Sequence, residues 1–476
     1  VTRQYRSSWQ MYDRHLYPGG ACRLHMLRHE LGDAVFWNAV RDYLRRFTGQ
    51  VVETEDFRRV LEEHSGRSLV SFFDQWFYTP GYPAIKVSFS YDAEQRQGRF
   101  EIEQTQVDKD KGIPAFSFTT DIGWTIDGVN HTRAVMVKEA KQWIVVPMAQ
   151  APDQVRFDPG HKVLHKLDFN PGDPLLRRQL TEAQDVIGRI LAARELVKTG
   201  RHGNVAAVIE AYAKEPFWGV RVQMAKALGD AGTETAITGL VEIVQSESEA
   251  KALESVIRAA GKYRDRRLRD AIAKRFEAGL PYRAAQAALE ALGAQREDAP
   301  WDLLVSAAQR EDFSGFVQAG ALRGLAHTRR AEAVDLLLQH SAYGATPNRA
   351  RPAAVSALAD VGSVLERRSR ERVVERLVDL LRDPVLTVRR AAARGLGSMA
   401  AGEAAAALEA YQQTLPLQEQ VEVERLLREL RGKESPKVAA LEKQLQELQE
   451  RYRKLEERLQ QLEGRLAPPA DCVARG

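Results

Sequence analysis

Cysteine is scarce in this sequence, which has only Cys22 and Cys472 among its 476 residues. Two cysteines do not make a disulfide framework, so a small disulfide-stapled fold is excluded. Long apolar runs are missing as well. None approaches the roughly 18 consecutive apolar residues that a membrane-spanning helix needs, which excludes a membrane span in this part of the protein.

A strong excess of charge of one sign is also absent. The 69 lysines and arginines are nearly balanced by 65 aspartates and glutamates, which leaves a net charge of +4. No basic cluster interleaved with aromatic residues stands out, so the sequence gives no reason to expect nucleic acid as a partner. With 44% hydrophobic and 28% charged residues, the composition is that of a globular chain. The length suffices for about three domains.

The first 83 residues carry helix-period patterns. A stripe of apolar residues predicts a helix over residues 20–31: Ala21, Leu24, Leu27 and Leu31. We expect Gly32 to end it as a left-handed cap and Asp33 to cap the next helix. Thr54 is expected to open a third helix that stops near residues 65–66. A short aromatic helix over residues 72–77 completes this part.

The segment Tyr-Pro-Gly-Gly-Ala begins at Tyr17, just before the first of these helices. It resembles the Tyr-x-Lys-Gly-Ala motif of the aminopeptidase N and leukotriene hydrolase family of zinc metallopeptidases, with Gly19 in place of lysine. The resemblance implies that Tyr17 hydrogen-bonds the oxyanion of the tetrahedral intermediate and that Gly19 and Gly20 line the substrate cleft. A phenol with a pKa near ~10 remains a neutral donor at working pH, which suits this role. Residues 1–83 would then be the C-terminal part of a thermolysin-like, gluzincin catalytic domain.

The zinc ligands of that family are a His-Glu-x-x-His helix and a later glutamate, both before the motif tyrosine. No such motif precedes Tyr17, and the chain begins with Val1. We therefore expect a C-terminal part of a longer protein, whose zinc ligands lie outside this chain and without which this part is inactive. His25 and His29 have the i, i+4 spacing of a zinc pair, but Met26 stands where the signature has glutamate. We interpret these histidines as partly buried helix residues.

Between residues 84 and 170 the apolar period changes from helical spacing to two. Alternating residues such as Ile85 and Val87 predict six or seven short strands, with turns at residues 97–98, 111–114 and 127–128. This pattern indicates a small β-sandwich. The resemblance implies a sandwich at this position that braces the catalytic domain.

Two further histidines, His161 and His165, fall near the end of this β-rich region. They could be read as a metal pair on one face of a strand. No third ligand clusters with them, which favours a structural role.

Residues 171–432 contain a repeated unit. After a Pro- and Gly-rich break, a segment rich in alanine, leucine and glycine recurs, and its copies end at residues 229, 261, 293, 326, 359 and 397. A spacing of 32 to 33 residues, stretched to 38 at the last interval, is typical of a solenoid of helical hairpins. Residues 383–392 resemble the Asp-Pro…Val-Arg…Ala-Ala pattern of HEAT-type repeats. We expect the small residues to let neighbouring repeats pack closely.

Residues 433–467 have a third period. Apolar residues recur at steps of three and four from Val438 to Leu466, which predicts a coiled coil followed by a disordered tail at 468–476. Its e and g charges, such as Arg451 and Glu456, favour a parallel homodimer over an antiparallel one. A parallel trimer stays open, as does docking of this helix on its own solenoid.

These features predict a multidomain, mainly α protein with a β-sandwich, a HEAT-like α-solenoid and a C-terminal coiled coil. We expect a part of a zinc-dependent metallo-aminopeptidase that removes N-terminal residues from peptides, so its partners would be peptide substrates. The alternative is a non-catalytic aminopeptidase-like scaffold that uses its repeats for protein–protein interaction. Retention of Tyr17 favours the enzyme. The peptide preference, the carboxylate-binding residues and the compartment stay open.

Overall fold

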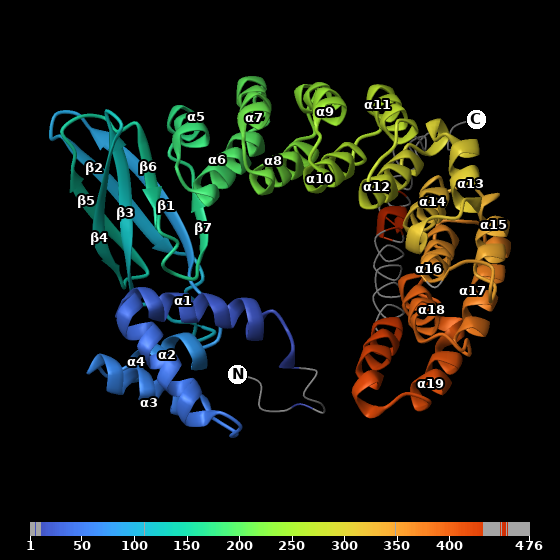
Figure 1. Cartoon of the computed structure of the whole chain (residues 1–476), viewed down its shortest axis with the longest axis horizontal. Coiled ribbons are helices and arrows are strands. Elements are labelled where there is room, and N and C mark those ends of the chain that lie inside the picture. Colours follow the sequence, from blue (N-terminus) through green and yellow to red (C-terminus); the bar gives the residue numbers. More distant parts are fainter. Residues whose placement is uncertain are drawn as a thin grey trace, which may run out of the picture. The chain divides into compact units, whose positions relative to one another are not determined.

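The chain is mainly α-helical, with two small β-sheets and a long run of packed helices (Figure 1). The computed structural model describes residues 5, 11–108, 110–347, 349–431, 448, 450–453 and 455. They form two compact units, divided between Asp298 and Ala299. Within these residues, no helix combines the length and the apolar character that crossing a bilayer requires. The predicted coiled coil and the tail lie outside the described residues, apart from a few positions between 448 and 455, so the coil stays a prediction.

Short helices open the first unit around a small core. They are η2 (His15–Gly19, a π-helical turn), α1 (Gly20–Leu31), α2 (Asp33–Phe47), α3 (Thr54–Ser65), α4 (Val70–Phe73) and η3 (Asp74–Tyr78, π-helical). Leu27, Leu61 and Phe73 are at most 1% exposed in this core. The predicted helix over 20–31 and the helix opened by Thr54 are confirmed.

The two predicted caps between α1 and α2 are wrong in detail. Gly32 has a positive φ of 80°, but its ψ of 154° is extended and not left-handed helical. Asp33 is the first residue of α2 and caps nothing. Its carboxylate instead accepts hydrogen bonds from Nε and Nη2 of Arg28, both at 2.7 Å, because Arg28 stands in the last turn of α1. This ion pair replaces the expected cap.

Seven strands follow among the described residues, and they form two sheets. They are β1 (Ala84–Asp92), β2 (Gln97–Gln104), β3 (Phe118–Ile126), β4 (Val129–Val137), β5 (Lys141–Pro147), β6 (Gln154–Phe157) and β7 (Lys166–Phe169). One sheet has the strand order β5-β2-β1-β7 and the other the order β4-β3-β6. The β1–β7 pair is parallel, and the other paired strands are antiparallel. Buried residues of both sheets, such as Phe100 and Ile122, share one hydrophobic core.

The predicted turn at residues 97–98 is wrong, since Gln97 and Gly98 lie at the start of β2. The turn covers residues 93–96, directly before β2, and Arg96 in it takes a positive φ of 50°. Gly98 instead lies against a buried side chain. A Cβ there would lie 2.6 Å from the sulfur of Met148, so a larger residue would make the end of that side chain shift.

Helical hairpins complete the first unit. They are α5 (Asp173–Glu182), α6 (Val186–Lys198), α7 (His202–Lys214), α8 (Trp218–Asp230), α9 (Glu234–Ser246), α10 (Ala250–Ala260), α11 (Arg266–Glu277), α12 (Tyr282–Gly293) and the 3-10 turn η4 (Arg296–Asp298). The helices stack in two layers: α6, α8, α10 and α12 pack in order, as do α5, α7, α9 and α11 (Figure 1). This is the architecture that the 32-residue period predicts.

The second unit continues the pattern. It contains α13 (Trp301–Gln309), η5 (Phe313–Gly315), α14 (Phe316–His327), α15 (Ala333–His340), α16 (Ala350–Gly362), α17 (Arg367–Leu380), α18 (Leu386–Ser398), η6 (Gly402–Ala404), α19 (Ala405–Gln413) and a helix over residues 417–431. Helices α14, α16 and α18 pack in order, and α15 packs on α17. The predicted repeat ends at 326, 359 and 397 fall in the last turns of α14, α16 and α18.

Close packing between repeats depends on the small residues, as expected. A Cβ on Gly229 would lie 2.9 Å from Cα of Ala259, and one on Gly261 would lie 2.6 Å from Cβ of Ala291. Both distances are shorter than any ordinary carbon–carbon contact. Each glycine therefore touches the small residue one repeat further along.

We expect Gly261→Ala to lower the free energy of unfolding by about 1–3 kcal/mol, the usual cost of overpacking a core. Gly261 has an ordinary helical φ of −65°, so the loss would come from the clash with Ala291 alone. Gly20→Ala is the matched control, because Gly20 is also helical but has no atom near its missing Cβ. Urea denaturation of both variants measures the difference, and equal stabilities would contradict the packing argument.

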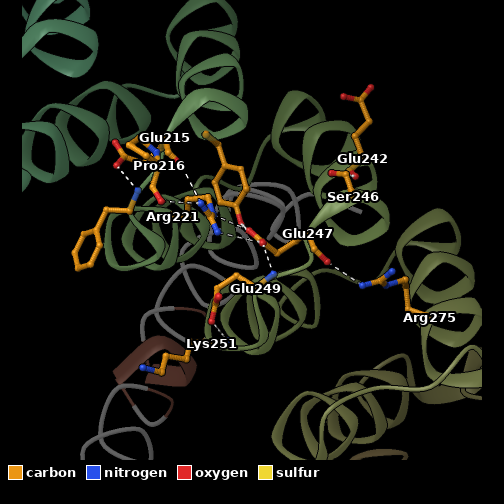
Figure 2. Close-up of polar contacts among 11 residues, drawn as sticks. Glu215, Pro216, Arg221, Glu242, Ser246, Glu247, Glu249, Lys251 and Arg275 are labelled. Carbon is orange, nitrogen blue, oxygen red and sulfur yellow. Dashed lines mark hydrogen bonds and ion pairs between the residues drawn. The ribbon is translucent and has the colours of Figure 1, made fainter.

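Buried pairs of arginine and glutamate also join successive repeats, and Figure 2 shows the pair of Arg221 and Glu247. Nε of Arg189, on α6, donates to Glu215 at 2.7 Å, and Nε of Arg221, on α8, donates to Glu247 at 2.9 Å. In each pair the glutamate is 26 residues further along the chain and its side chain is only 4% exposed. Nη1 of Arg221 also donates to the backbone carbonyl of Glu215 at 2.9 Å. One arginine thus binds the turns of two neighbouring repeats.

Candidate functional site

Tyr17 lies in η2, the π-helical turn that runs directly into α1. Its side chain is 65% exposed, and no described residue hydrogen-bonds its hydroxyl. The ring of Tyr12 lies 5.9 Å away, centroid to centroid. The Tyr17 hydroxyl is therefore free to donate a hydrogen bond to an incoming group.

Asp13 holds the beginning of this turn. Its Oδ1 accepts hydrogen bonds from the backbone amides of His15 at 2.8 Å and Leu16 at 3.1 Å. The His15 ring places Nδ1 2.8 Å from the other carboxylate oxygen. This ring, followed by the Leu16 amide, holds the pKa of Asp13 below its ordinary value of 3.8. The carboxylate thus satisfies amides that the turn itself leaves unpaired.

Arg23 fastens the other end of the turn. Its Nη1 donates to the carbonyl oxygen of Gly19 at 2.9 Å, and its Nε donates to the carbonyl oxygen of Trp76. A Cβ on Gly19 would lie 2.9 Å from Nη1 of Arg23, so a larger residue would displace the guanidinium. Glycine at position 19 therefore leaves room for the guanidinium of Arg23, which occupies the space that a side chain at this position would fill. The motif alone did not predict the contact that Arg23 makes with Gly19. Its position four residues after Gly19 could have indicated that contact, because residues four apart on a helix are neighbours.

The turn is anchored through Arg23 to the core of the sheets. Trp76 is 3% exposed and packs its ring 5.2 Å from that of Phe116, and Met26 of α1 belongs to the same core. Gln75 donates to the carbonyl of Ser117 and accepts from its amide, each at 2.8 Å. The helices that carry Tyr17 and the β-sheets are thus packed together as one body, which limits movement of the turn.

Gly20, the other predicted cleft residue, starts α1 and has a helical φ of −62°. No atom lies within 4 Å of the position that its Cβ would take. Open space at this position is compatible with the predicted cleft. Its contact with a substrate stays a prediction.

The histidines of α1 form a pair, and no third ligand joins them among the residues that the structure describes. His25 and His29 place their Nε2 atoms 3.1 Å apart, and their rings meet edge to face. His25 is partly buried, as expected, whereas His29 is exposed. Burial, followed by the charge of His25, lowers the pKa of His29. His29 therefore favours the neutral form around neutral pH.

His161 and His165 do not share a strand face. His161 lies in a turn with a positive φ of 50°, where its Nε2 is 3.5 Å from a carboxylate oxygen of Asp185. His165 precedes β7, and its Nδ1 lies 2.8 Å from the carbonyl oxygen of Val163. Burial lowers the pKa of His165. The two rings have separate polar partners, which is a structural arrangement.

No three side chains of His, Cys, Asp or Glu come together as metal ligands would in the part of the chain that the structure describes. The described side chains of these types therefore do not fit a zinc ion. What this part of the chain does offer is the phenol of Tyr17. It is a hydrogen-bond donor without a partner among the described residues, and it lies on an anchored turn.

Comparison with known proteins finds family matches for separate segments of the chain. Residues 2–76 match the Peptidase family M1 domain, residues 174–261 match HEAT repeats, and residues 388–414 match the PBS lyase HEAT-like repeat. The chain thus contains a C-terminal region of the M1 aminopeptidase family followed by HEAT-like repeats, and the resemblance inferred from the motif is confirmed. The family is a metallopeptidase family, which implies zinc in the family.

Individual proteins that match this chain are also aminopeptidases. Aminopeptidase M1-A of Oryza sativa subsp. japonica is 31% identical over 97 residues, which cover 20% of this chain and 10% of that protein. The puromycin-sensitive aminopeptidase of Caenorhabditis elegans is 24% identical over 203 residues, covering 40% of this chain and 21% of that protein. This chain therefore matches only a tenth to a fifth of these relatives' lengths.

A solved structure shows the same fold over most of the chain. The crystal structure of Legionella pneumophila aminopeptidase A in complex with aspartic acid superposes with a TM-score of 0.57 at 13% identity. The match covers 90% of this chain and 58% of that one. The likeness therefore extends beyond the M1 segment to the helices that follow it.

Proposed function

We propose that this chain is part of a zinc-dependent aminopeptidase that hydrolyses N-terminal residues from peptides, with Tyr17 as the donor to the tetrahedral oxyanion. The observation that carries the proposal is the Tyr17 hydroxyl, which has no hydrogen-bond partner among the described residues and lies on a turn held at both ends by Asp13 and Arg23. A donor fixed in advance stabilises developing negative charge without reorganising during the reaction. The zinc ligands would lie outside this chain.

In this proposal each residue has a limited task. Tyr17 keeps its proton and donates a hydrogen bond to the oxygen that gains negative charge. Arg23 is a positioning residue, because it reaches only the backbone carbonyls of Gly19 and Trp76. Gly20 would leave space for substrate beside the turn, whereas the space beside Gly19 is taken by the guanidinium of Arg23, so Gly19 would border the cleft through its backbone. Substrates would be peptides, in keeping with the peptidase family matched by residues 2–76.

The test compares this chain with the protein translated from the complete reading frame. We expect the longer protein to release amino acids from aminoacyl-4-nitroanilides and to lose that activity when a chelator removes its metal. The 476-residue chain alone should bind no stoichiometric zinc and cleave none of these substrates. A metal-free and inactive full-length protein would overturn the proposal and favour the scaffold function instead.

A further inference from the structure

The second unit contains a cavity of about 640 Å³ that the proposed aminopeptidase site does not use. It is lined by residues of α17, α18 and α19 and by the turn that follows α19. Cavities of about 300–1,000 Å³ are typical of small-molecule sites. All of its lining residues belong to this unit.

Much of the cavity wall is apolar. Val378 comes from α17, Leu386 from the first residue of α18, and Leu415 from the turn after α19. Together they present aliphatic surface to the interior. An apolar group that enters would leave water, which favours binding.

Hydrogen-bond donors interrupt the apolar wall. Tyr411 is 4% exposed, and its buried hydroxyl has no hydrogen-bond partner among the described residues. Leaving a buried hydroxyl unpaired is costly, so a bound acceptor would relieve that cost. The hydroxyl of Thr414 is already engaged, because it donates to the carbonyl of Tyr411 at 2.7 Å.

The charged lining residues leave an excess of positive charge. The guanidinium of Arg382 is exposed and has no partner among the described residues. Arg389 uses Nη1 on the carbonyls of Asp383 and Pro384 and keeps its other N–H donors. The single acidic residue in the lining, Glu419, is paired with Arg390 at 3.1 Å. The cavity therefore combines free cationic donors with an aliphatic wall.

We propose that this cavity binds an apolar carboxylate, with the carboxylate on Arg382 and Arg389 and the apolar body against the aliphatic wall. Arginine is suited to this task because its fork of N–H groups matches the two oxygens of a carboxylate. The Tyr411 hydroxyl would supply a further donor. Two sources share this chemistry: a free medium-chain fatty acid and the C-terminal end of a short apolar peptide.

The probes are decanoate, the peptide Leu-Leu-Leu and the same peptide with an amidated C-terminus, each titrated into the 476-residue chain by calorimetry. We expect decanoate or the free peptide to bind and the amide to bind at least tenfold more weakly, because it lacks the charge that arginine recognises. Binding of decanoate alone would identify the lipid source, and binding of the free peptide alone the peptide source. Failure of both to bind, or equal binding of the amide, would overturn the proposal.

Variants separate recognition from folding. Arg382→Gln should weaken binding about tenfold, whereas Arg368→Gln, an exposed arginine of α17 outside the cavity lining, should leave it unchanged. Tyr411→Phe should weaken binding several-fold without lowering the melting temperature, because the hydroxyl forms no hydrogen bond with any described residue. Unchanged binding in both Arg382→Gln and Tyr411→Phe would reject the assigned geometry. The outcome is independent of aminopeptidase activity.

Discussion

Replacing Tyr17 by phenylalanine in the longer aminopeptidase proposed above is expected to lower kcat about 10²–10³-fold, the usual effect of losing one oxyanion donor. The KM for the substrate should change little, because the hydrogen bond forms mainly in the transition state. The fold should be unaffected, since the Tyr17 side chain is largely exposed and no described residue hydrogen-bonds its hydroxyl. Steady-state kinetics with an aminoacyl-4-nitroanilide measures the effect.

Tyr12→Phe is the matched control for this experiment. Tyr12 is a neighbouring exposed tyrosine whose ring lies 5.9 Å from that of Tyr17. It should leave kcat within a few-fold of the unchanged enzyme, while the metal content of both variants stays the same. Near-normal kcat in Tyr17→Phe would remove the role assigned to that hydroxyl, even if the protein proves to be an active peptidase.

Replacing Glu247 by alanine should lower the free energy of unfolding by about 3–5 kcal/mol, the scale for breaking a buried ion pair by removing one partner. The carboxylate accepts hydrogen bonds from Arg221, from the Tyr212 hydroxyl and from the backbone amide of Glu249 (Figure 2). Burial alone would raise the pKa of Glu247, but these bonds outweigh it and hold the pKa below the ordinary value of 4.5. Without the carboxylate, the charge of Arg221 and the hydroxyl of Tyr212 would be left largely buried and unpaired.

Glu242→Ala provides the control for this loss. Glu242 stands one turn earlier on α9, and its side chain is exposed (Figure 2). Its replacement should change stability by no more than about 0.5 kcal/mol. Urea denaturation of the 476-residue chain, followed by circular dichroism, compares the variants. Equal midpoints for Glu247→Ala and Glu242→Ala would show that the buried network between repeats contributes no stability.

Local sequence signals predicted the secondary structure well where periodicity is strong. The helix over residues 20–31, the strands after residue 84 and the repeat ends all lie where their apolar periods place them. The physical reason is that each helix or strand must bury one face. The spacing of its apolar residues shows which face that is. Turns and caps were less predictable. The carboxylate of Asp33 binds Arg28, and the space beside Gly98 is filled by Met148, both of which depend on neighbours outside the local pattern.

The sequence by itself determined the M1 resemblance at Tyr17, the change of period at residue 84 and the solenoid, because each is a matter of residue type and spacing along the chain. Only the tertiary structure decided what supports the candidate site. Arg23 acts on Tyr17 by reaching Trp76, 53 residues away in sequence, and Arg221 meets Glu247 only because two helical hairpins stack. Such contacts follow from chain folding across long separations, and no local pattern of residues encodes which distant partner a buried charge will find.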